Sequence, residues 1–247
     1  MVSQSDFDVP KPMEFVLPVG YAGIKVVGSF EELVSTPFEG VVNAMVWPRG
    51  LAGDFGEVAD ALPEGEGITV VEEDELRELT LSAAGRVARD VMLADLALLR
   101  GADLTPVLDV IHPHERPVPE GVIPTDVYSW HADSATGQAD TYLCTYAGAC
   151  SEGLRHDQVI PRADDPATRA MMLAEYGGED DAGFREFLTE NFYDLHFLPT
   201  SGAKPYFFGQ HHLWRVSIVY PGSPVPPCVH RAPLTSAGMA RRLLLLS

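Results

Sequence analysis

The sequence contains few positive charges, few cysteines and no long apolar run. Only three of its 247 residues are lysines, and with 14 arginines they make 17 basic side chains against 36 acidic ones, a net charge of −19. Nonspecific binding to nucleic acids or to anionic membranes requires clustered positive charge, so we expect neither as a partner. No segment approaches the run of about 20 apolar residues that crosses a membrane, so we expect no membrane span.

The scarcity of cysteine bears on the compartment. Cys144, Cys150 and Cys228 fit no zinc-binding spacing, and one thiol is left over if two of them pair. A reducing compartment is therefore the simpler interpretation. Residues 1–12 have neither the basic start nor the apolar stretch of a signal peptide. We expect a cytoplasmic protein.

What the chain does contain is enough apolar sequence for a sizeable core. Hydrophobic residues make up 46% and charged residues 21% of the chain, proportions that exclude an intrinsically disordered protein. The length suits one large domain. We expect residues 1–104 to form a helical and extended N-terminal support, and residues 105–247 to form a strand-rich core with a helical insert at residues 164–199.

Helical periodicity is clearest at residues 80–100, where apolar residues recur at a spacing of three and four and Gly101 provides a stop. A shorter amphipathic helix is expected at residues 51–62, stopped by Pro63. The acidic residues 64–78 are expected to form a solvated loop that leads into a helix. Two further helices are expected in the insert, at residues 166–176 and 181–192.

Short segments rich in Val, Ile, Thr, Tyr and Leu, separated by Pro, Gly, Asp and Ser, predict antiparallel strands in a sandwich or barrel. In the N-terminal part they are residues 14–19, 23–27 and 41–47. In the core they are residues 106–111, 126–131, 140–147, 214–220, 228–231 and 242–246. The expected fold class is therefore α+β, with helices mainly in front of the strands.

One pair of residues near the end of an expected strand could bind a metal ion. His131 and Asp133 are separated by one residue, and side chains alternate along a strand, so both point to one face. An imidazole and a carboxylate suit a divalent metal, and a second histidine would complete the two-histidine, one-carboxylate set that holds non-haem Fe(II). The competing interpretation is a strand-end histidine hydrogen-bonded to a turn aspartate.

The second histidine is expected to be His230, 99 residues beyond His131 (230 − 131). Arg241 and Arg242 follow it by eleven and twelve residues and open the last expected strand. An arginine in this place suits a 2-oxoglutarate site, because its guanidinium binds a carboxylate through two parallel hydrogen bonds. Adjacent strand residues face opposite ways, so only one arginine can face the interior, and we favour Arg242.

These pieces, in this order, resemble the Fe(II)/2-oxoglutarate-dependent dioxygenase superfamily. The chain is also similar to a family of uncharacterised bacterial proteins placed near that superfamily. The similar stretches are residues 42–49, 131–133, 143–148, 230–233 and 242–245. The chain departs from that family's pattern at residues 149–153 and in the insert, where substrate contacts are expected, so the resemblance does not carry over a substrate.

The resemblance implies a double-stranded β-helix, also called a jelly-roll or cupin-like core. It further implies Fe(II) bound by His131, Asp133 and His230, with 2-oxoglutarate and O2 as co-substrates. The implied reaction oxidises an unactivated C–H bond of a small molecule that is amino-acid-, peptide- or nucleoside-like. Halogenases of this superfamily have Gly or Ala at the carboxylate position, so Asp133 favours hydroxylation or a related oxidation over chlorination.

Other side chains are candidates for the same site. Arg242 or Arg241 would hold 2-oxoglutarate, with a hydroxyl from Tyr142 or Thr145. The expected substrate contacts are Tyr128, Trp214, His212 and Arg215. Two alternatives stay open: a cupin-like metalloenzyme that does not use 2-oxoglutarate, and a non-catalytic jelly-roll binding module.

Overall fold

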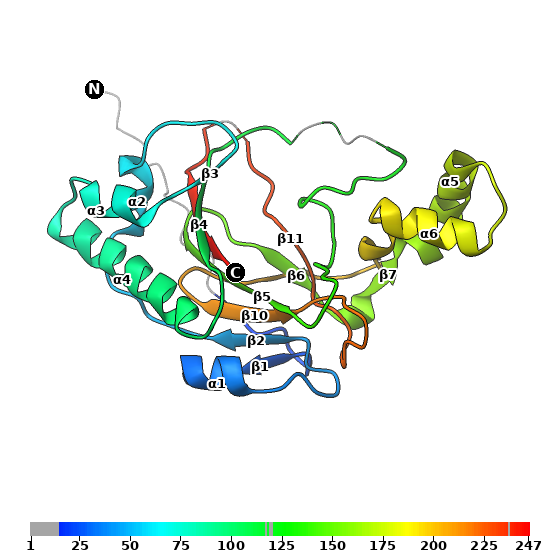
Figure 1. The fold of residues 1–247 in the computed structure, drawn as a ribbon, viewed down its shortest axis with the longest axis horizontal. Coiled ribbons are helices and arrows are strands. Elements are labelled where there is room, and N and C mark those ends of the chain that lie inside the picture. The colour runs from blue at the N-terminus through cyan, green and yellow to red at the C-terminus, as the bar shows by residue number, and fades with distance from the viewer. Residues whose placement is uncertain (1–14, 117, 119–120, 237) are drawn as a thin grey trace, which may run out of the picture.

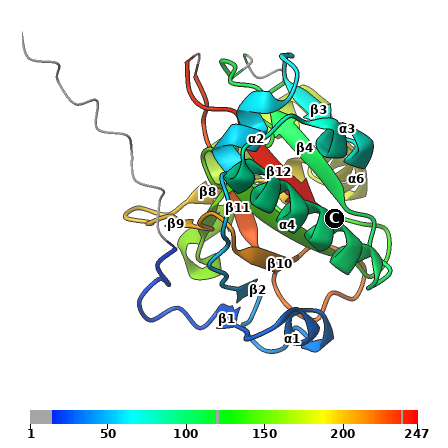
Figure 2. The ribbon, with the colours of Figure 1, turned by 90° about the vertical axis from the view of Figure 1, so that its left-hand side faces the viewer.

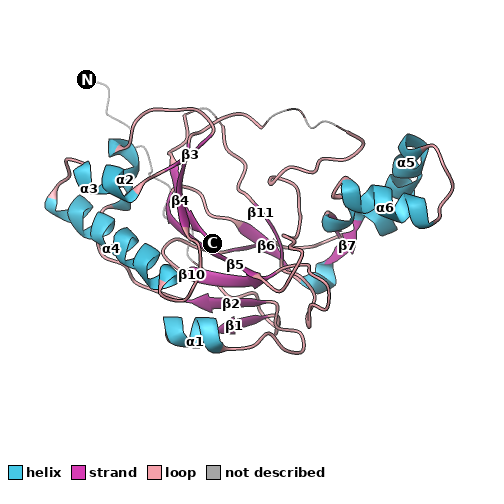
Figure 3. Cartoon of the chain, in the orientation of Figure 1, coloured by secondary structure: helices cyan, strands magenta, loops and turns pink. Residues whose placement is uncertain are grey.

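The computed structural model describes residues 15–116, 118, 121–236 and 238–247. Within them the chain has a mixed α+β fold built around one large sheet, with helices grouped at one end and a helical pair that projects from the other (Figures 1 and 3). The expected α+β class is therefore confirmed. None of the helices in these ranges combines the length and the apolar character that a membrane span needs.

The large sheet has seven strands. In spatial order they are β1 (Ile24–Val26), β2 (Ala44–Trp47), β10 (Leu213–Ser217), β5 (Asp140–Ala147), β12 (Arg242–Leu246), β4 (Val107–Ile111) and β3 (Ile68–Val70). All neighbours are antiparallel except β1 and β2. A register shift between Leu243 and Leu244 marks an irregularity where β12 pairs with β5.

A smaller sheet faces this one. It contains β11 (Val229–Arg231), β6 (Glu152–Leu154) and β9 (Tyr206–Phe207), and a separate pair joins β7 (Val159–Pro161) to β8 (Phe197–Pro199). His131 connects the two groups, because it bridges to His230 on one side and to His196 on the other.

Residues 126–131, expected to be a strand, form only this bridge. Asp126 accepts hydrogen bonds from the backbone N–H groups of Tyr128 and Ser129, and the Ser129 hydroxyl donates to the Asp126 carbonyl. This side-chain turn competes with strand pairing. The prediction of a strand there is therefore wrong except at its last residue.

The helices at one end cover the outer face of the large sheet. They are α1 (Phe30–Ser35), α2 (Phe55–Ala61), α3 (Glu73–Glu78) and α4 (Ala83–Arg100). Ser82 caps α4 by accepting from the Gly85 N–H. The buried face of α4 packs with Leu108, Tyr146 and Leu243 in one apolar core, and Figure 2 shows α4 lying across the strands.

The insert contains α5 (Pro166–Tyr176) and α6 (Ala182–Glu190), together with three short 3-10 turns nearby in sequence (His156–Gln158, Arg162–Asp164 and Tyr193–Leu195). Gly177 ends α5 in the left-handed conformation, with φ of 72°. Met172, Phe184 and Leu188 form a small apolar cluster of their own. The helices expected in the insert are confirmed, the second slightly shorter than predicted.

Several other boundaries differ from the expectation. The acidic residues 64–78 include strand β3 as well as helix α3, and α1 was not expected at all. Residue 14 of the first expected strand lies outside the described residues, and residues 15–19 form no strand. The strands expected at residues 140–147 and 242–246 are present with the predicted ends. Those expected at residues 23–27, 41–47, 106–111, 214–220 and 228–231 are present with shifted ends.

Candidate metal centre

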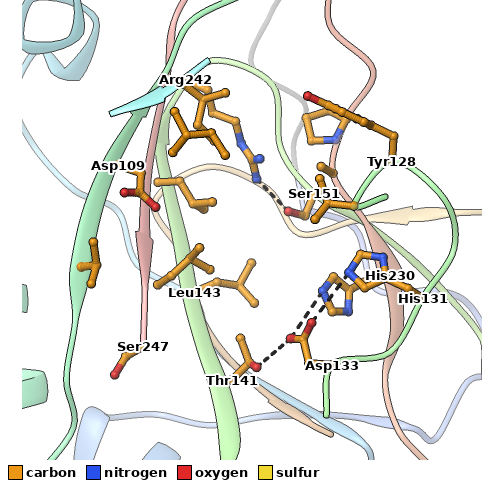
Figure 4. Close-up of a pocket in the computed structure, with 18 of the residues that line it drawn as sticks. Asp109, Tyr128, His131, Asp133, Thr141, Leu143, Ser151, His230, Arg242 and Ser247 are labelled. Atoms are coloured by element: carbon orange, nitrogen blue, oxygen red, sulfur yellow. Dashed lines mark hydrogen bonds and ion pairs between the residues drawn. The ribbon is translucent and has the colours of Figure 1, made fainter. Parts of the chain in front are cut away.

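A pocket of about 390 Å³ lies between the two sheets (Figure 4). Alternate residues of β4, β5 and β12 form one wall, and the opposite alternates of the same strands belong to the core under α4. His131, Asp133 and His230 form the facing wall. The alternation of side chains along strands thus separates the core from the pocket.

The three predicted ligands come together at this pocket. One ligand atom from each of His131, Asp133 and His230 lies within 4.8 Å of the others. The Nε2 atoms of the two histidines are 3.7 and 3.8 Å from the Asp133 oxygens. These distances are too long for hydrogen bonds, which weighs against a histidine simply bonded to a turn aspartate. They are shorter than two metal–ligand bonds of about 2.1 Å laid end to end, so one ion can contact all three residues.

The histidine rings are oriented for metal binding. The Nδ1 of His131 is 2.8 Å from the Ser129 carbonyl, and the Nδ1 of His230 is 3.2 Å from the Cys228 carbonyl. A carbonyl only accepts, so each Nδ1 carries the proton and each Nε2 keeps a free lone pair. Burial, and then the charge of His230, lowers the pKa of His131 to about 4. His131 is therefore neutral at physiological pH, as a ligand must be.

Asp133 is held by a neighbouring strand. Its Oδ2 accepts a hydrogen bond of 2.7 Å from the Thr141 hydroxyl on β5. Burial alone would raise the pKa of Asp133, but the charge of His230 and the Thr141 bond outweigh it and lower the pKa. The carboxylate is thus ionised and oriented toward the two imidazoles.

Arg242 lies in the same pocket, across from the histidines (Figure 4). Its Nη2 donates to the Ser151 hydroxyl at 2.7 Å and lies 3.5 Å from the Thr145 hydroxyl. Its Nε is buried with no partner among the described residues. Burial lowers the pKa of Arg242 to about 10, so the side chain is still a cation at neutral pH.

Arg241 points the other way. Its guanidinium donates to the carbonyls of Ala59 and Leu62, at the end of α2. Strand alternation allows only one of the two arginines to face the interior, and the structure places Arg242, the predicted one, in the pocket.

Of the other predicted site residues, some lie at the pocket and others do not. Tyr128 lines the pocket, and Thr145 approaches it through Arg242. Four do not line the pocket: Tyr142, Trp214, His212 and Arg215.

The predictions for these four residues are corrected by their surroundings. Tyr142 faces the core under α4, whereas its neighbour Thr141 faces the pocket. Arg215 pairs with Asp140 and donates to three carbonyls at the end of α1. Trp214 is fully buried and stacked on Phe208. The His212 ring accepts from a backbone N–H.

Sequence reasoning missed two residues beside the centre. Ser151 lies in a stretch considered only as a departure from the family pattern, yet it holds Arg242. His196 lies in the insert, and its ring is 6.0 Å from that of His131. Neither has a local sequence signal, because each reaches the site through pairing of segments far apart in the chain.

The three cysteines are free and buried. Burial raises the pKa of Cys144 and Cys228 to about 12 and that of Cys150 to about 11. Because the thiolate is the reactive form, the native protein should react with a disulfide reagent at least about 100-fold more slowly than free cysteine.

A time course of thiol release, native and in denaturant, tests this expectation. All three thiols should react promptly once the chain is unfolded. A fast thiol in the native protein would show that one of these side chains is open to solvent.

Comparison of the chain with protein-family models, with curated proteins and with solved structures found no match.

Proposed function

We propose that the protein is an Fe(II)/2-oxoglutarate-dependent oxygenase that oxidises an unactivated C–H bond of a small molecule. The observation that supports this best is the sharing of one pocket by a two-histidine, one-carboxylate set and a buried arginine with an unpartnered Nε. The first suits Fe(II) and leaves coordination positions open. The second suits the far carboxylate of a 2-oxo diacid.

Residues of the pocket would bind either the iron or its co-substrate. His131, Asp133 and His230 would bind iron, which when bound supplies the oxidising chemistry with O2 and 2-oxoglutarate. Arg242 would bind the co-substrate's far carboxylate, with Ser151 and Thr145 orienting the guanidinium. The apolar side chains between them, Leu143 and Leu244, line the pocket and exclude water from the reacting groups.

The strand order supports a jelly-roll core for the proposed oxygenase. The β7–β8 pair, which forms a separate sheet, is left out, and β4, the His131 segment, β5, β6, β9, β10, β11 and β12 are numbered one to eight in chain order. The large sheet then holds the sixth, third, eighth and first in that order. The second, seventh, fourth and fifth lie in order in the smaller sheet. A jelly roll would have such an alternation between two facing sheets. β1, β2 and β3 would then extend its edges.

Anaerobic titration with Fe(II) and 2-oxoglutarate tests the proposal. A weak visible charge-transfer band should appear when both are present, because the 2-oxo acid then binds directly to the iron. The His131→Ala protein should lose the band, and a His156→Ala protein should keep it, since His156 is exposed and outside the pocket.

Other outcomes separate the alternatives. Iron binding without the band would favour a cupin-like metalloenzyme that does not use 2-oxoglutarate. Failure of the wild-type protein to bind iron would leave a non-catalytic binding module. A band of equal strength in the His131→Ala protein would show that the iron is bound elsewhere.

A further inference from the structure

The metal-binding histidines belong to a longer row of side chains. His131 is directly opposite His230 on one side and His196 on the other, in antiparallel bridges. The β7–β8 pairing continues this row, because Pro161 pairs with Phe197 and the Arg162 N–H donates to the His196 carbonyl at 2.8 Å. Directly opposed residues point to the same face of a sheet. Arg162 and His196 therefore extend this row beside the metal centre, although neither lines the pocket of Figure 4.

His196 presents a free acceptor beside the centre. Its Nδ1 is 2.8 Å from the Phe192 carbonyl, so this nitrogen carries the proton. Its Nε2 is buried and forms no hydrogen bond with any described residue, although the Asp126 backbone lies close enough to act on the pKa of the ring. The residue is only 4% exposed. A buried acceptor without a donor costs free energy. A ligand that donates an N–H or O–H would remove this cost.

Arg162 presents a cation without an anion. Its side chain forms no hydrogen bond or ion pair with any described residue, and its Nε is buried. The neighbouring Asp165 is engaged at the start of α5, where it accepts from the N–H and the hydroxyl of Thr168. Burial, and then the charge of Arg116, lowers the pKa of Arg162. In a chain of net charge −19, this arginine has been left without a carboxylate.

Arg116 does not offer a competing cation of the same kind. Both its Nε and its Nη2 bond to the two oxygens of Asp126, at 2.9 and 2.8 Å, so its charge is already paired. Arg162 is thus an arginine on this side of the metal centre whose guanidinium forms no hydrogen bond or ion pair with a described residue. Arg242 is on the opposite sheet.

We propose that Arg162 and His196 form the binding site for the primary substrate, a small carboxylate that carries an amino or hydroxyl donor near its acid group. The carboxylate binds the Arg162 guanidinium, and the donor binds the Nε2 of His196. This inference rests on the proposed function for the reaction that follows binding, but the binding itself needs neither iron nor 2-oxoglutarate.

The spacing of the row limits the size of the substrate. Neighbouring strands are about 4.8 Å apart, so Arg162 lies about 5 Å from His196 and about 10 Å from His131, measured between backbones. When the substrate's carboxylate binds Arg162 and its donor binds His196, only a few bonds of the substrate can separate these groups from the metal centre. An amino-acid-sized molecule fits this interval.

Titration of the metal-free protein with three probes of similar size tests the site, with binding followed by ligand-observed NMR. Norvaline has both the carboxylate and the donor, pentanoate lacks the donor, and norvalinamide lacks the carboxylate. The wild-type protein should bind norvaline most tightly. Arg162→Gln should weaken norvaline at least tenfold and leave norvalinamide unchanged, and Arg162→Lys should have an intermediate effect.

Two arginine variants are matched controls. Arg185→Gln removes an exposed arginine from the same insert and should change nothing. Arg242→Gln tests whether norvaline instead occupies the arginine across the pocket, and it too should leave norvaline binding unchanged. His196→Phe should remove the donor's advantage, so that norvaline and pentanoate bind within about twofold of each other.

Three results would overturn the inference: no norvaline binding by the wild-type protein at millimolar concentrations, equal binding by Arg162→Gln, or a loss in Arg242→Gln as large as in Arg162→Gln. Because iron is absent from these titrations, their failure is distinct from failure of the charge-transfer experiment.

Discussion

Replacement of Asp95 by alanine is expected to lower the free energy of unfolding by about 3–5 kcal/mol, because it leaves a buried cation without a partner. Asp95, on the buried face of α4, accepts from Arg49 Nη1 with both oxygens, at 2.7 and 2.8 Å. Its Oδ2 also accepts from the Tyr146 hydroxyl at 2.6 Å. The carboxylate therefore joins α4 to the segment after β2 and to β5.

The magnitude depends on burial. The side chains of Arg49 and Asp95 are 6% and 8% exposed, so water cannot replace the lost carboxylate. Asp90→Ala is a matched control on the same helix, since it makes the same change in helix propensity at a side chain that is 65% exposed. That variant should change stability by less than about 1 kcal/mol. Denaturant unfolding of the two variants measures the difference.

A double variant separates the charge effect from packing. Arg49→Met combined with Asp95→Leu removes both charges, and such apolar replacements of buried pairs are often close to neutral. It should be more stable than Asp95→Ala, although it also loses the Arg49 bonds to the His211 carbonyl and to Cys144. If Asp95→Ala and Asp90→Ala lose equal stability, the buried network does not stabilise the fold.

The sequence carried a signal for this network that periodicity alone did not reveal. Asp95 lies on the same helical face as Met92, Leu96 and Leu99, where a charge is out of place. The pattern predicted the helix correctly, although two of its apolar residues, Val87 and Leu98, are exposed. The partners of Asp95 could not be predicted, because Arg49 and Tyr146 are 46 and 51 residues away and meet it only through packing.

The site was predictable where local rules applied. The spacing of His131 and Asp133 predicted that they lie together, and they do, although the segment forms only an isolated bridge at His131 in place of the expected strand. Strand alternation separated Arg242 from Arg241, and the structure agrees. The same rule argues against grouping Tyr142 with Thr145, which face opposite sides of β5.

Several strands of two or three residues were missed, because segments this short show little periodicity, although β1 and β11 are equally short and were predicted. Strands β6, β7, β8 and β9 are of this kind. Two of them, β7 and β8, pair with each other, and Arg162 directly follows β7 while His196 directly precedes β8. The part of the site contributed by the insert was therefore beyond sequence patterns.

Arg242→Met is expected to weaken 2-oxoglutarate binding by about 2–3 kcal/mol, roughly 30- to 140-fold, because it removes a charge-assisted pair of hydrogen bonds to a carboxylate. Titration of the iron-loaded protein under anaerobic conditions measures the loss. Arg241→Met should leave the affinity unchanged, since that guanidinium bonds to the carbonyls at the end of α2. A loss in Arg241→Met alone would contradict the assignment.

Arg242→Met should weaken 2-oxoglutarate binding without lowering the stability of the fold. This contrast identifies the role of Arg242. Arg242 is 4% exposed, has no carboxylate partner among the described residues and keeps a buried Nε without an acceptor. Burial lowers its pKa to about 10, which means that the folded state disfavours the charge relative to the unfolded chain. Methionine fills a similar volume without that cost, so denaturant unfolding should show Arg242→Met at least as stable as the wild-type protein.

A residue that costs stability without its ligand and is required for binding it is a binding residue. If Arg242→Met instead lowers stability and leaves 2-oxoglutarate affinity unchanged, Arg242 serves the fold, and the metal centre acts without that co-substrate.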